Sequence, residues 1–347
     1  MRNNSSATKL DLRETQIAIK SVKDYFQRDL ANTLNLQRVS APLFVRPETG
    51  LNDNLNGEKA VDFDLRQYGI NVEIVQSLAK WKRNALKEYN FNMYEGIYAD
   101  MNAIRAEEEL DEIHSSYVDQ WDWEKIIDKS DRNKEYLYLT VKEIYSVFKR
   151  CEEYINQTYP YILSKKLPDE IFFITSQELE DLYPGKTSKE REKLICKDKG
   201  AVFIMGIGAD LNSGEPHDHR SPDYDDWSLN GDILFWDEVL GNSIEVSSMG
   251  IRVDEESLRS QCELANTTDR FKLKYHQDVL NANLPYTIGG GIGQSRICMF
   301  FLEKSHIGEV QVGVWDEKSL NYCKENKNKT IIKFKKITNW IQILRNI

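Results

Sequence analysis

Four glycines and an arginine stand close together late in the chain, in the sequence GGGIGQSR at residues 289–296. Glycine has no Cβ, so a phosphate or a flat base can approach the backbone closely, and Arg296 can offer a forked donor to a phosphate from the helix that follows. Four glycines in five positions exceed what a tight strand-to-helix turn needs. The block therefore predicts a nucleotide site, with a plain turn as the alternative.

Two common nucleotide motifs do not fit this chain. A dinucleotide-binding loop needs a glycine three places after its Gly-x-Gly pair, and Gln294 and Arg296 stand where glycine is required. The sequence GKT at residues 185–187 suggests a P-loop, but Glu180 replaces the glycine expected five places earlier. We expect an exposed loop at that position instead.

A second polar cluster, HDHRSPDYDDW, covers residues 217–227. His217 and His219, with Asp223 or Asp225, are candidate zinc ligands. No third His or Cys stands nearby, and the carboxylates are equally suited to bind an amine. An exposed acidic turn is a third interpretation, and the residues alone leave all three open.

Two further carboxylates, Asp232 and Glu245, fall on successive predicted strands. Such oxygen donors suit a Mg²⁺ ion that also contacts phosphate oxygens. Beside Arg296 the pair gains weight, because nucleotide transfer requires both a metal and a guanidinium to offset charge developing on the phosphates. Arg105, at the end of a predicted strand, is a second candidate phosphate clamp, with an ordinary surface arginine as the alternative.

Composition narrows the class of protein that could carry these residues. With 347 residues, 40% hydrophobic and 29% charged, the chain can bury one large core. A net charge of −10 argues against a nucleic-acid-binding surface, so the expected partner is small. Residues 318–347 carry +7 and the preceding part of the chain −17, so the tail has a separate composition.

The cysteines and the apolar runs indicate the cellular compartment in which the protein is expected. Five cysteines stand far apart with no CxxC pair, which predicts neither a zinc knuckle nor a disulfide framework. No apolar run approaches the roughly 18 residues of a membrane span. We therefore expect a cytoplasmic protein with no membrane partner.

Hydrophobic periodicity predicts the elements that must position these side chains. Helices are expected at residues 13–35, 77–89 and 135–158, and strands at residues 39–45, 97–105, 113–123, 171–174, 201–207, 232–236 and 243–253. Pro42 confines the first strand to a sheet edge or a subunit boundary. Several strands in succession without helices between them predict an α+β fold, an antiparallel β-sheet flanked by helices.

Six segments carry a resemblance to a known family. They are SLAKWKR at 77–83, HSSYVDQWDWE at 114–124, PDYDDW at 222–227, LNGDIL at 229–234, SSMGIRVD at 247–254 and the glycine block. Together they resemble the aspartate–ammonia ligases, the ammonia-dependent asparagine synthetases, from about residue 12 to residue 315. These motifs are long and rare.

That family is related to the catalytic domain of class II aminoacyl-tRNA synthetases, which implies the fold. The first helix followed by Pro42 resembles the dimer-forming first motif of that class, so a homodimer is implied. Residues 104–107 resemble the second motif, in which a strand-end arginine holds the α-phosphate. Residues 291–296 resemble the third, which makes the glycine block one wall of an ATP site.

The resemblance also implies a reaction. ATP activates the side-chain carboxylate of L-aspartate, diphosphate leaves, and ammonia attacks the resulting β-aspartyl-AMP to give asparagine and AMP. A carboxylate oxygen leaves badly whereas AMP is a stable leaving group, and the attack joins two anions. Arg105, Arg296 and Mg²⁺ are therefore expected to neutralise them.

Roles carried over by motif position complete the expected site. The catalytic residues implied are Asp53, Arg105 and Gln120. The aspartate pocket implied is Lys82, Asp122, Asp225, Ser248 and Arg252. The nucleotide side implied is Ser115, Val118, Ser247, Gly291 and Arg296, with Asp232 and Glu245 for Mg²⁺. For Asp53, the residues alone favour an Asx turn in Asn52–Asn54 equally.

Two features depart from the family. Only Ser228 separates PDYDDW from LNGDIL, where family members often carry extra residues. The basic tail is unlike the family's short end. We expect a flexible N-terminus at 1–11, one catalytic domain at 12–317 and a basic extension at 318–347.

Two other functions remain as alternatives to the ligase. A non-catalytic relative that binds an amino acid or an adenylate would keep the same fold. A tRNA-charging enzyme would need an anticodon-binding domain and a basic face, and neither is visible before the tail. Without an amidotransferase segment or an N-terminal cysteine, we expect glutamine to be a poor nitrogen donor.

Overall fold

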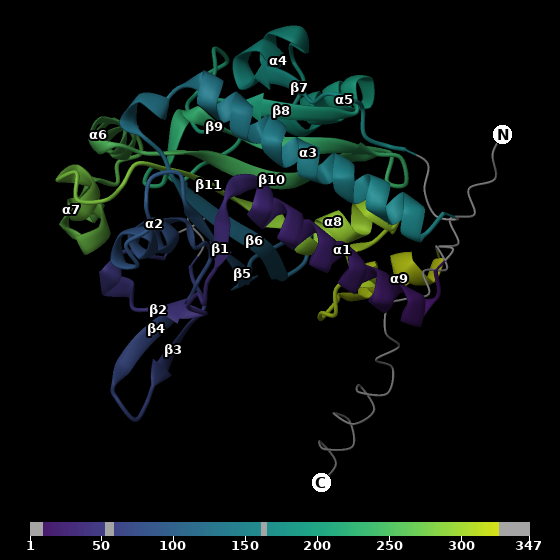
Figure 1. Cartoon of the computed structure of the whole chain (residues 1–347), viewed down its shortest axis with the longest axis horizontal. Helices are drawn as coiled ribbons and strands as arrows, with labels where there is room; N and C mark the ends of the chain where they lie inside the picture. The colour runs from purple at the N-terminus through teal and green to yellow at the C-terminus, as the bar shows by residue number, and fades with distance from the viewer. Residues whose placement is uncertain (1–9, 53–58, 161–164, 326–347) are drawn as a thin grey trace.

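A large sheet organises the molecule in the computed structural model, which describes residues 10–52, 59–160 and 165–325 (Figure 1). Its eight strands run in the order β1 (Leu36–Arg38), β5 (Gly96–Ile104), β6 (Tyr117–Ile126), β11 (Thr287–Gly293), β10 (Asn242–Arg252), β9 (Asp225–Asp237), β8 (Ala201–Met205) and β7 (Phe172–Thr175). A second sheet holds β2 (Phe44–Val45), β4 (Ile70–Ile74) and β3 (Asp62–Leu65).

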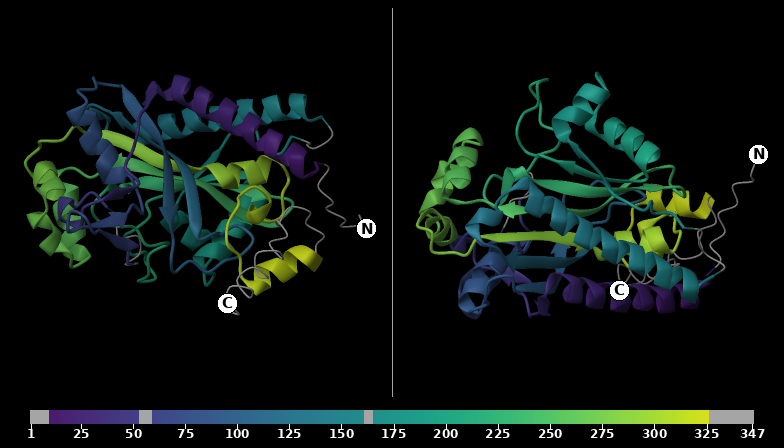
Figure 2. Two further views of the ribbon diagram at one scale, coloured as in Figure 1. Left: turned by 90° about the horizontal axis from the view of Figure 1, so that it is seen from below. Right: turned by 45° about the horizontal axis from the view of Figure 1, so that its top comes forward.

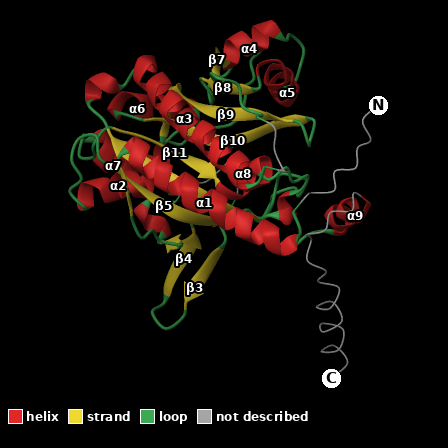
Figure 3. Cartoon of the chain, turned by 45° about the vertical axis from the view of Figure 1, so that its right-hand side comes forward, coloured by secondary structure: helices red, strands yellow, loops and turns green. Residues whose placement is uncertain are grey.

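Helices surround the main sheet (Figure 3). The α-helices are α1 (Leu12–Leu34), α2 (Ala79–Glu88), α3 (Lys134–Thr158), α4 (Ser176–Leu182), α5 (Ser188–Lys199), α6 (Glu255–Leu264), α7 (Lys274–Leu280), α8 (Gln294–Phe301) and α9 (Glu317–Glu325). Short 3₁₀ turns lie at η1 (Pro47–Thr49), η3 (Lys129–Asp131), η4 (Thr268–Lys272) and η5 (Ile307–Glu309). Among the described helices, none has the length and apolarity needed to span a membrane.

The predicted α+β class is confirmed, with a difference at both sheet edges. In the order of the sheet, the strands β5, β6, β11, β10, β9 and β8 pair antiparallel, as expected. At the two edges, β1 pairs with β5 and β7 pairs with β8 in parallel. Both parallel strands are short edge strands joined to their neighbours through helices, which supply the crossover that parallel pairing requires.

One face of the sheet is covered by two long helices. Figure 2 shows α1 and α3 side by side on that face, and the two helices contact each other. Helix α1 begins with a capping box between Asp11 and Glu14 and ends at Asn35 in the left-handed conformation. Its buried side chains recur at helical spacing, and the ring of Phe26 stacks on Trp121 with 4.9 Å between centroids. This packing forms the main hydrophobic core.

The predicted elements are mostly where the periodicity put them, and one prediction fails. Of the expected strand at 39–45, only β2 (Phe44–Val45) forms; β1 ends before it at Arg38, and Pro42 lies in the irregular segment between the two. The hairpin loop is longer than expected, because β6 begins only at Tyr117. The GKT sequence lies in a turn before α5, with Thr187 as its N-cap, so the rejection of a P-loop stands.

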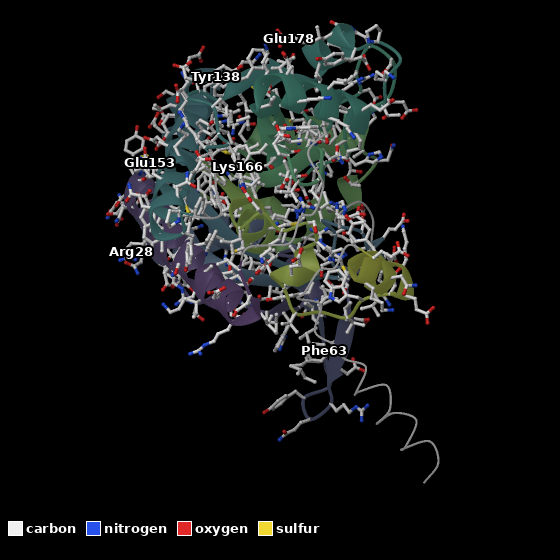
Figure 4. The ribbon with its side chains drawn as sticks, turned by 90° about the vertical axis from the view of Figure 1, so that its right-hand side faces the viewer. Arg28, Phe63, Tyr138, Glu153, Lys166 and Glu178 are labelled. Carbon is white, nitrogen blue, oxygen red and sulfur yellow. The ribbon has the colours of Figure 1, made fainter. Side chains whose placement is uncertain are left out.

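The β3–β4 hairpin extends away from the body (Figure 3). Phe63 lies on it, away from the main sheet in Figure 4, and its ring packs against Phe44 with 5.3 Å between centroids. Leu43 and Tyr68 are also exposed nearby, so the hairpin region presents an apolar surface.

Candidate active site

A cavity of about 360 Å³ opens on the face of the sheet that α1 and α3 leave uncovered. Strand alternation places its lining: Trp121 and Trp123 of β6 enter the core, so Gln120 and Asp122 face the cavity. Strands β10 and β11 and the loop between β5 and β6 supply much of the remaining lining.

A bulge in β10 brings non-alternating residues to the same cavity. The register with β9 shifts between Glu245 and Ser247. Without that extra residue, Glu245 and Ser248 would face opposite sides of the sheet, since they are an odd number of positions apart. With it, both line the cavity together with Ser247.

The glycine block is a strand, β11, not a loop, and its glycines make room for neighbouring side chains. The backbone there is at negative φ. A Cβ on Gly291 would collide with the amide of Gln120, and a Cβ on Gly289 with the carboxylate of Glu124 and, at 2.5 Å, with Nη2 of Arg252. The absence of side chains on β11 therefore lets polar groups from β6 and β10 lie flat over the sheet.

Arg105 directly follows β5, as predicted, and its guanidinium is available for a ligand. Its backbone N–H donates to the carbonyl of Ser116 at 2.8 Å, which fixes the strand end. Within the described part of the chain, the guanidinium has no hydrogen bond or ion pair, and Nε is buried. A buried donor without a partner costs free energy, so an anion in the cavity would satisfy it.

Arg296 lies in the first turn of α8 and lines the same cavity as Arg105. Its Nη1 donates to the backbone carbonyl of Glu245 at 3.0 Å and lies 3.8 Å from the carboxylate of the same residue. Nearby, the hydroxyl of Ser247 is buried and without a hydrogen-bond partner among the described residues. This end of the cavity therefore contains a guanidinium that Glu245 holds in place.

The carboxylates predicted for Mg²⁺ lie close enough to influence each other. Burial raises the pKa of Asp232 to about 6, with Arg220 opposing the rise and Glu245 adding to it. For Glu245, burial alone would raise the pKa, but Arg296 and Arg220 hold it lower.

This donor set fits Mg²⁺. Glu245 adds to the rise in the pKa of Asp232, so a cation between the two carboxylates would favour the ionised form of Asp232. Mg²⁺ typically takes one or two carboxylates while phosphate and water complete its shell. Asp232 lies below the cavity lining and is paired with Arg220 through both carboxylate oxygens. Across residues 10–52, 59–160 and 165–325, no group of three His, Cys, Asp or Glu side chains is placed to hold a metal.

The zinc alternative receives no support. His217 is buried, and its Nε2 lies 3.2 Å from Glu192 Oε1, while His219 is exposed at the cavity rim. Asp223 is fully buried among cations, and Asp225 pairs with an arginine. The cluster at 217–227 is therefore neither a zinc site nor an exposed turn.

The predicted aspartate pocket is a buried network of alternating charge. Arg252 donates to Glu124 through Nε, at 2.9 Å to Oε1, and Nη2, at 2.7 Å to Oε2, and pairs through Nη1 with Asp225. Burial would raise the pKa of Glu124, but Arg252 and Lys82 lower it. Lys82 pairs with Asp122 and donates to the carbonyl of Trp123 at 2.8 Å.

Lys82 lies beneath the cavity. Its side chain has no exposed surface, and it is 3.6 Å from Glu124 as well as being paired with Asp122. Asp122 and Asp225 reach the cavity above it. In this arrangement Lys82 contacts the pocket carboxylates directly. It could contact a ligand only if the ligand displaced those carboxylates.

The structure brings most of the predicted residues to one cavity. Lining it are Arg105, Ser115, Val118, Gln120, Asp122, Asp225, Glu245, Ser247, Ser248, Arg252, Gly291 and Arg296. Lys82 and Asp232 lie just below. Asp53 lies outside the described residues.

Several lining residues were given no role in the expected aspartate and nucleotide sites. They are Gln76, Ser77, His114, Lys189, His219 and Arg220, of which Ser77 and His114 lie in the quoted motifs and His219 was considered only as a zinc ligand. Lys189 is on α5, a helix that no motif marked, and its approach to the cavity depends on packing of α5 against β9 and β10. Arg220 was signalled by its position inside the polar cluster at 217–227.

Comparisons with known proteins bear on this site. The family described as aspartate–ammonia ligase matches residues 13–327. A relative of that name from Clostridium tetani is 62% identical over 327 residues, covering 94% of this chain and 95% of its own. One from Fusobacterium nucleatum is 62% identical over 317 residues, covering 91% and 96%.

Solved structures with a similar fold are more distant in sequence. Asparaginyl-tRNA synthetase from Pyrococcus horikoshii, complexed with asparaginyl-adenylate, aligns with a TM-score of 0.62 at 16% identity, covering 86% of this chain and 68% of that one. The Entamoeba histolytica enzyme in the same kind of complex gives 0.60 at 13% identity, covering 86% and 66%, so the chain spans just under two thirds of it. These likenesses show the class II synthetase fold.

Proposed function

The chain belongs to the aspartate–ammonia ligase family, and from that premise we propose how its residues divide the reaction among them. The enzyme amidates L-aspartate with ammonia to L-asparagine, consuming ATP and releasing AMP and diphosphate by way of β-aspartyl-AMP. Neither the family match nor the relatives support the alternative of a non-catalytic adenylate-binding paralogue.

We base the assignment of roles on one observation: two arginines from different elements line the same cavity. Arg105 directly follows β5, and its buried Nε has no hydrogen-bond partner among the described residues, while Arg296 extends from α8 beside Glu245. Attack of a carboxylate on the α-phosphate brings two anions together. We assign Arg105 to the α-phosphate and Arg296 to the nucleotide side, where Ser115, Val118, Ser247 and Gly291 complete the wall.

Asp232 and Glu245 are the residues that would hold Mg²⁺. When bound, the ion supplies positive charge to the phosphate oxygens. Glu245 already faces the cavity, whereas Asp232 must exchange its pairing with Arg220 to take part. That exchange would release Nη2 of Arg220, which lines the cavity, from Asp232.

The aspartate substrate fits the opposite, carboxylate-rich part of the cavity. We assign Asp122 and Asp225 to its α-amino group, since both reach the cavity and carry negative charge. Arg252 and Lys82 hold these carboxylates in place, and Ser248 lies within the same wall. Gln120 lies over Gly291, between the two halves, where it can orient the acyl group.

Ammonia must arrive as a neutral nucleophile and lose a proton after attack. The family resemblance assigns Asp53 to receive ammonium and its proton, and Asn52 beside it is anchored by its side chain to the backbone of Gln76 and Ile74, at 2.9 and 3.2 Å. The segment that leads to Asp53 is thus fixed next to Gln76, which lines the cavity. Glutamine is expected to be a poor donor.

We further propose a cytoplasmic homodimer. Cys151, Cys196, Cys262 and Cys298 are buried and form no disulfide within the described part of the chain, as expected in a reducing compartment. The exposed aromatic side chains on the β2–β4–β3 sheet provide apolar surface for a second copy. Light scattering after size exclusion should give twice the chain mass, and Phe63→Glu should shift it toward the monomer.

The reaction itself is tested with pure protein, ATP, Mg²⁺, aspartate and ammonium. Asparagine and AMP should form in equal amounts. Release of ADP, or product that requires added tRNA, would contradict the assignment. Replacing ammonium by glutamine should reduce the rate strongly.

A further inference from the structure

A buried ion cluster behind the cavity has no role in the chemistry described so far. It centres on Asp223, whose side chain has no exposed surface. Oδ2 accepts hydrogen bonds from Lys80 Nζ at 2.9 Å, Arg270 Nη1 at 3.0 Å and His276 Nε2 at 2.8 Å. Oδ1 accepts from Ser221 Oγ at 2.7 Å. Burial alone would raise the pKa of Asp223, but these partners, Lys80 foremost, hold it well below its usual range.

The partners of Asp223 come from parts of the chain that surround the aspartate pocket. Lys80 is on α2, between Ser77, which lines the cavity, and Lys82, which holds Asp122. Asp223 itself lies two residues before Asp225. The ion pair between Lys80 and Asp223 therefore joins the two segments that flank the pocket.

Two further partners, Arg270 and His276, belong to a small helical lobe of α6, η4 and α7. This lobe has its own hydrophobic cluster, formed by Val253, Leu258, Cys262, Tyr275, Val279 and Leu284. It lies at the side of the main sheet, away from α8 and α9 (Figure 1). Arg270 and His276 extend from it to Asp223.

The same lobe contacts two segments beside the pocket. Gln261 of α6 donates to the carbonyls of Pro222 and Asp225, at 3.0 and 2.9 Å, and accepts from the N–H of Trp227. On the other side, Leu51 packs against the lobe's cluster, and Gly50 is in a left-handed conformation close to His276. Leu51 lies two residues before Asp53.

We propose that the α6–α7 lobe positions the aspartate pocket, with Asp223 as the positioning residue at its centre, so that affinity for aspartate but not for ATP depends on this cluster. Asp223 does not touch the substrate. It fixes the described segment that ends at Asn52 and the segments that carry Lys82 and Asp225 relative to one another, and this inference rests on the roles given to the aspartate pocket above.

The residues assigned to the nucleotide are held by elements outside this cluster. Arg105 and Ser115 are held by the β5–β6 hairpin, Ser247 by β10 and Arg296 by α8. Among the described residues, none of these four has a hydrogen bond to the α6–η4–α7 lobe. Loosening the lobe should therefore affect the two substrates unequally.

The test is Asp223→Asn, compared with Asp269→Asn as a matched control. Asp269 is exposed on η4, directly before Arg270, so its substitution makes the same chemical change without reaching the cluster. Steady-state assays of asparagine formation should show the KM for aspartate raised at least about tenfold in Asp223→Asn and the KM for ATP unchanged within about twofold. Both constants should stay at wild-type values in the control.

A merely structural role predicts a different pattern. If both KM values rise together with a fall in melting temperature, or if the KM for aspartate is unchanged, the proposal is wrong. Should Asp223→Asn fail to fold, Arg270→Met removes a partly exposed partner and should raise the aspartate KM about threefold.

A conservative and a non-conservative substitution of His276 give a second test of the proposal. His276→Gln keeps a neutral donor toward Asp223 and should stay near the wild-type aspartate KM, whereas His276→Leu should raise it. Equal values for these two variants would also overturn the proposal. Failure of the wild type to make asparagine would instead contradict the assigned reaction, so the two hypotheses are separated.

Discussion

At the residue scale, the site depends on which charges are already paired. Arg252 and Lys82 are held by carboxylates, whereas the guanidinium of Arg105 has no partner in the described part of the chain. A paired cation mainly holds its neighbours in place, while an unpaired one can neutralise a ligand. The residue types of the site were predictable from motifs, but this division between positioning and binding cations was not, because it depends on contacts between distant strands.

Arg105→Ala should therefore impair adenylation more than it impairs folding. Removing one preorganised donor to a developing charge typically costs about 10²–10³-fold in kcat. AMP formation measured with saturating aspartate reports the change. Arg28→Ala is the control, since Arg28 lies on the outer surface of α1 (Figure 4). A loss below about fivefold would place the α-phosphate elsewhere.

Arg296→Ala tests the second arginine. The variant removes the charge beside Glu245 and leaves that carboxylate without its nearest cation, so the KM for ATP should rise together with a fall in AMP formation. Isothermal titration with AMP gives the binding change directly. Intact AMP formation in this variant would remove the glycine block from the nucleotide site.

Glu124 gives a prediction for stability and its pH dependence. Its pKa is lowered in the fold against the effect of burial, so its ionised form stabilises the protein above the ordinary pKa of 4.5, and that contribution is lost as pH falls below it. Glu124→Gln leaves Arg252 and Lys82 short of a counter-charge and should cost about 3–5 kcal/mol at pH 7.

Urea unfolding at pH 7 and pH 4 measures both effects. The difference between wild type and Glu124→Gln should be larger at pH 7 than at pH 4. A pH-independent difference would show that the lost stability comes from packing.

At the element scale, strand β11 was the least predictable part of the site. The sequence predicted a nucleotide site at its glycines, with a strand-to-helix turn as the alternative, and did not predict a strand, since glycine weakens a strand. The structure explains the exception through neighbours: the space above Gly289 and Gly291 is filled by side chains of β6 and β10. The bulge in β10 could not be predicted from the sequence either, because the alternation of side chains along a strand does not reveal an inserted residue.

Gly290→Ala tests the close pairing of β11 with β10. A Cβ there would lie 2.6 Å from the carbonyl oxygen of Ser248 and 2.6 Å from the Cβ of Met249. The strands must separate, so we expect a loss of about 1–3 kcal/mol in unfolding free energy and a fall in activity. Gly313→Ala is the control, because its new Cβ would meet only ordinary contacts at 3.7 Å. Equal melting temperatures for the two variants would contradict this account.

At the scale of the whole molecule, the two faces of the main sheet have separate functions. One face packs against α1 and α3 and supplies most of the core, while the other holds the cavity. The α+β class and most element positions followed from periodicity, because long amphipathic helices and buried strands carry strong local signals. The parallel edge strands and the α6–α7 lobe did not, since they depend on contacts far apart in sequence.

The C-terminal region gives the last prediction. The sequence places a domain boundary at residue 317, yet α9 begins there and buries Ser319 and Cys323, while the ring of Tyr322 lies 5.9 Å from that of His306. Residues 326–347 lie outside the described part, and the described cavity lining extends only to Gln311. A chain shortened to end at Glu325 should keep wild-type asparagine formation and melting temperature.

A chain shortened to end at Asp316 should behave differently, because it loses the buried side of α9. Burial of a single apolar side chain is worth about 1.5–3 kcal/mol, so the melting temperature should fall even though no cavity residue is removed. Thermal unfolding and asparagine assays of both shortened chains decide the boundary. If the chain ending at Asp316 is as stable as the one ending at Glu325, the catalytic domain ends at residue 317; if it is less stable, α9 belongs to that domain and the basic extension begins after it.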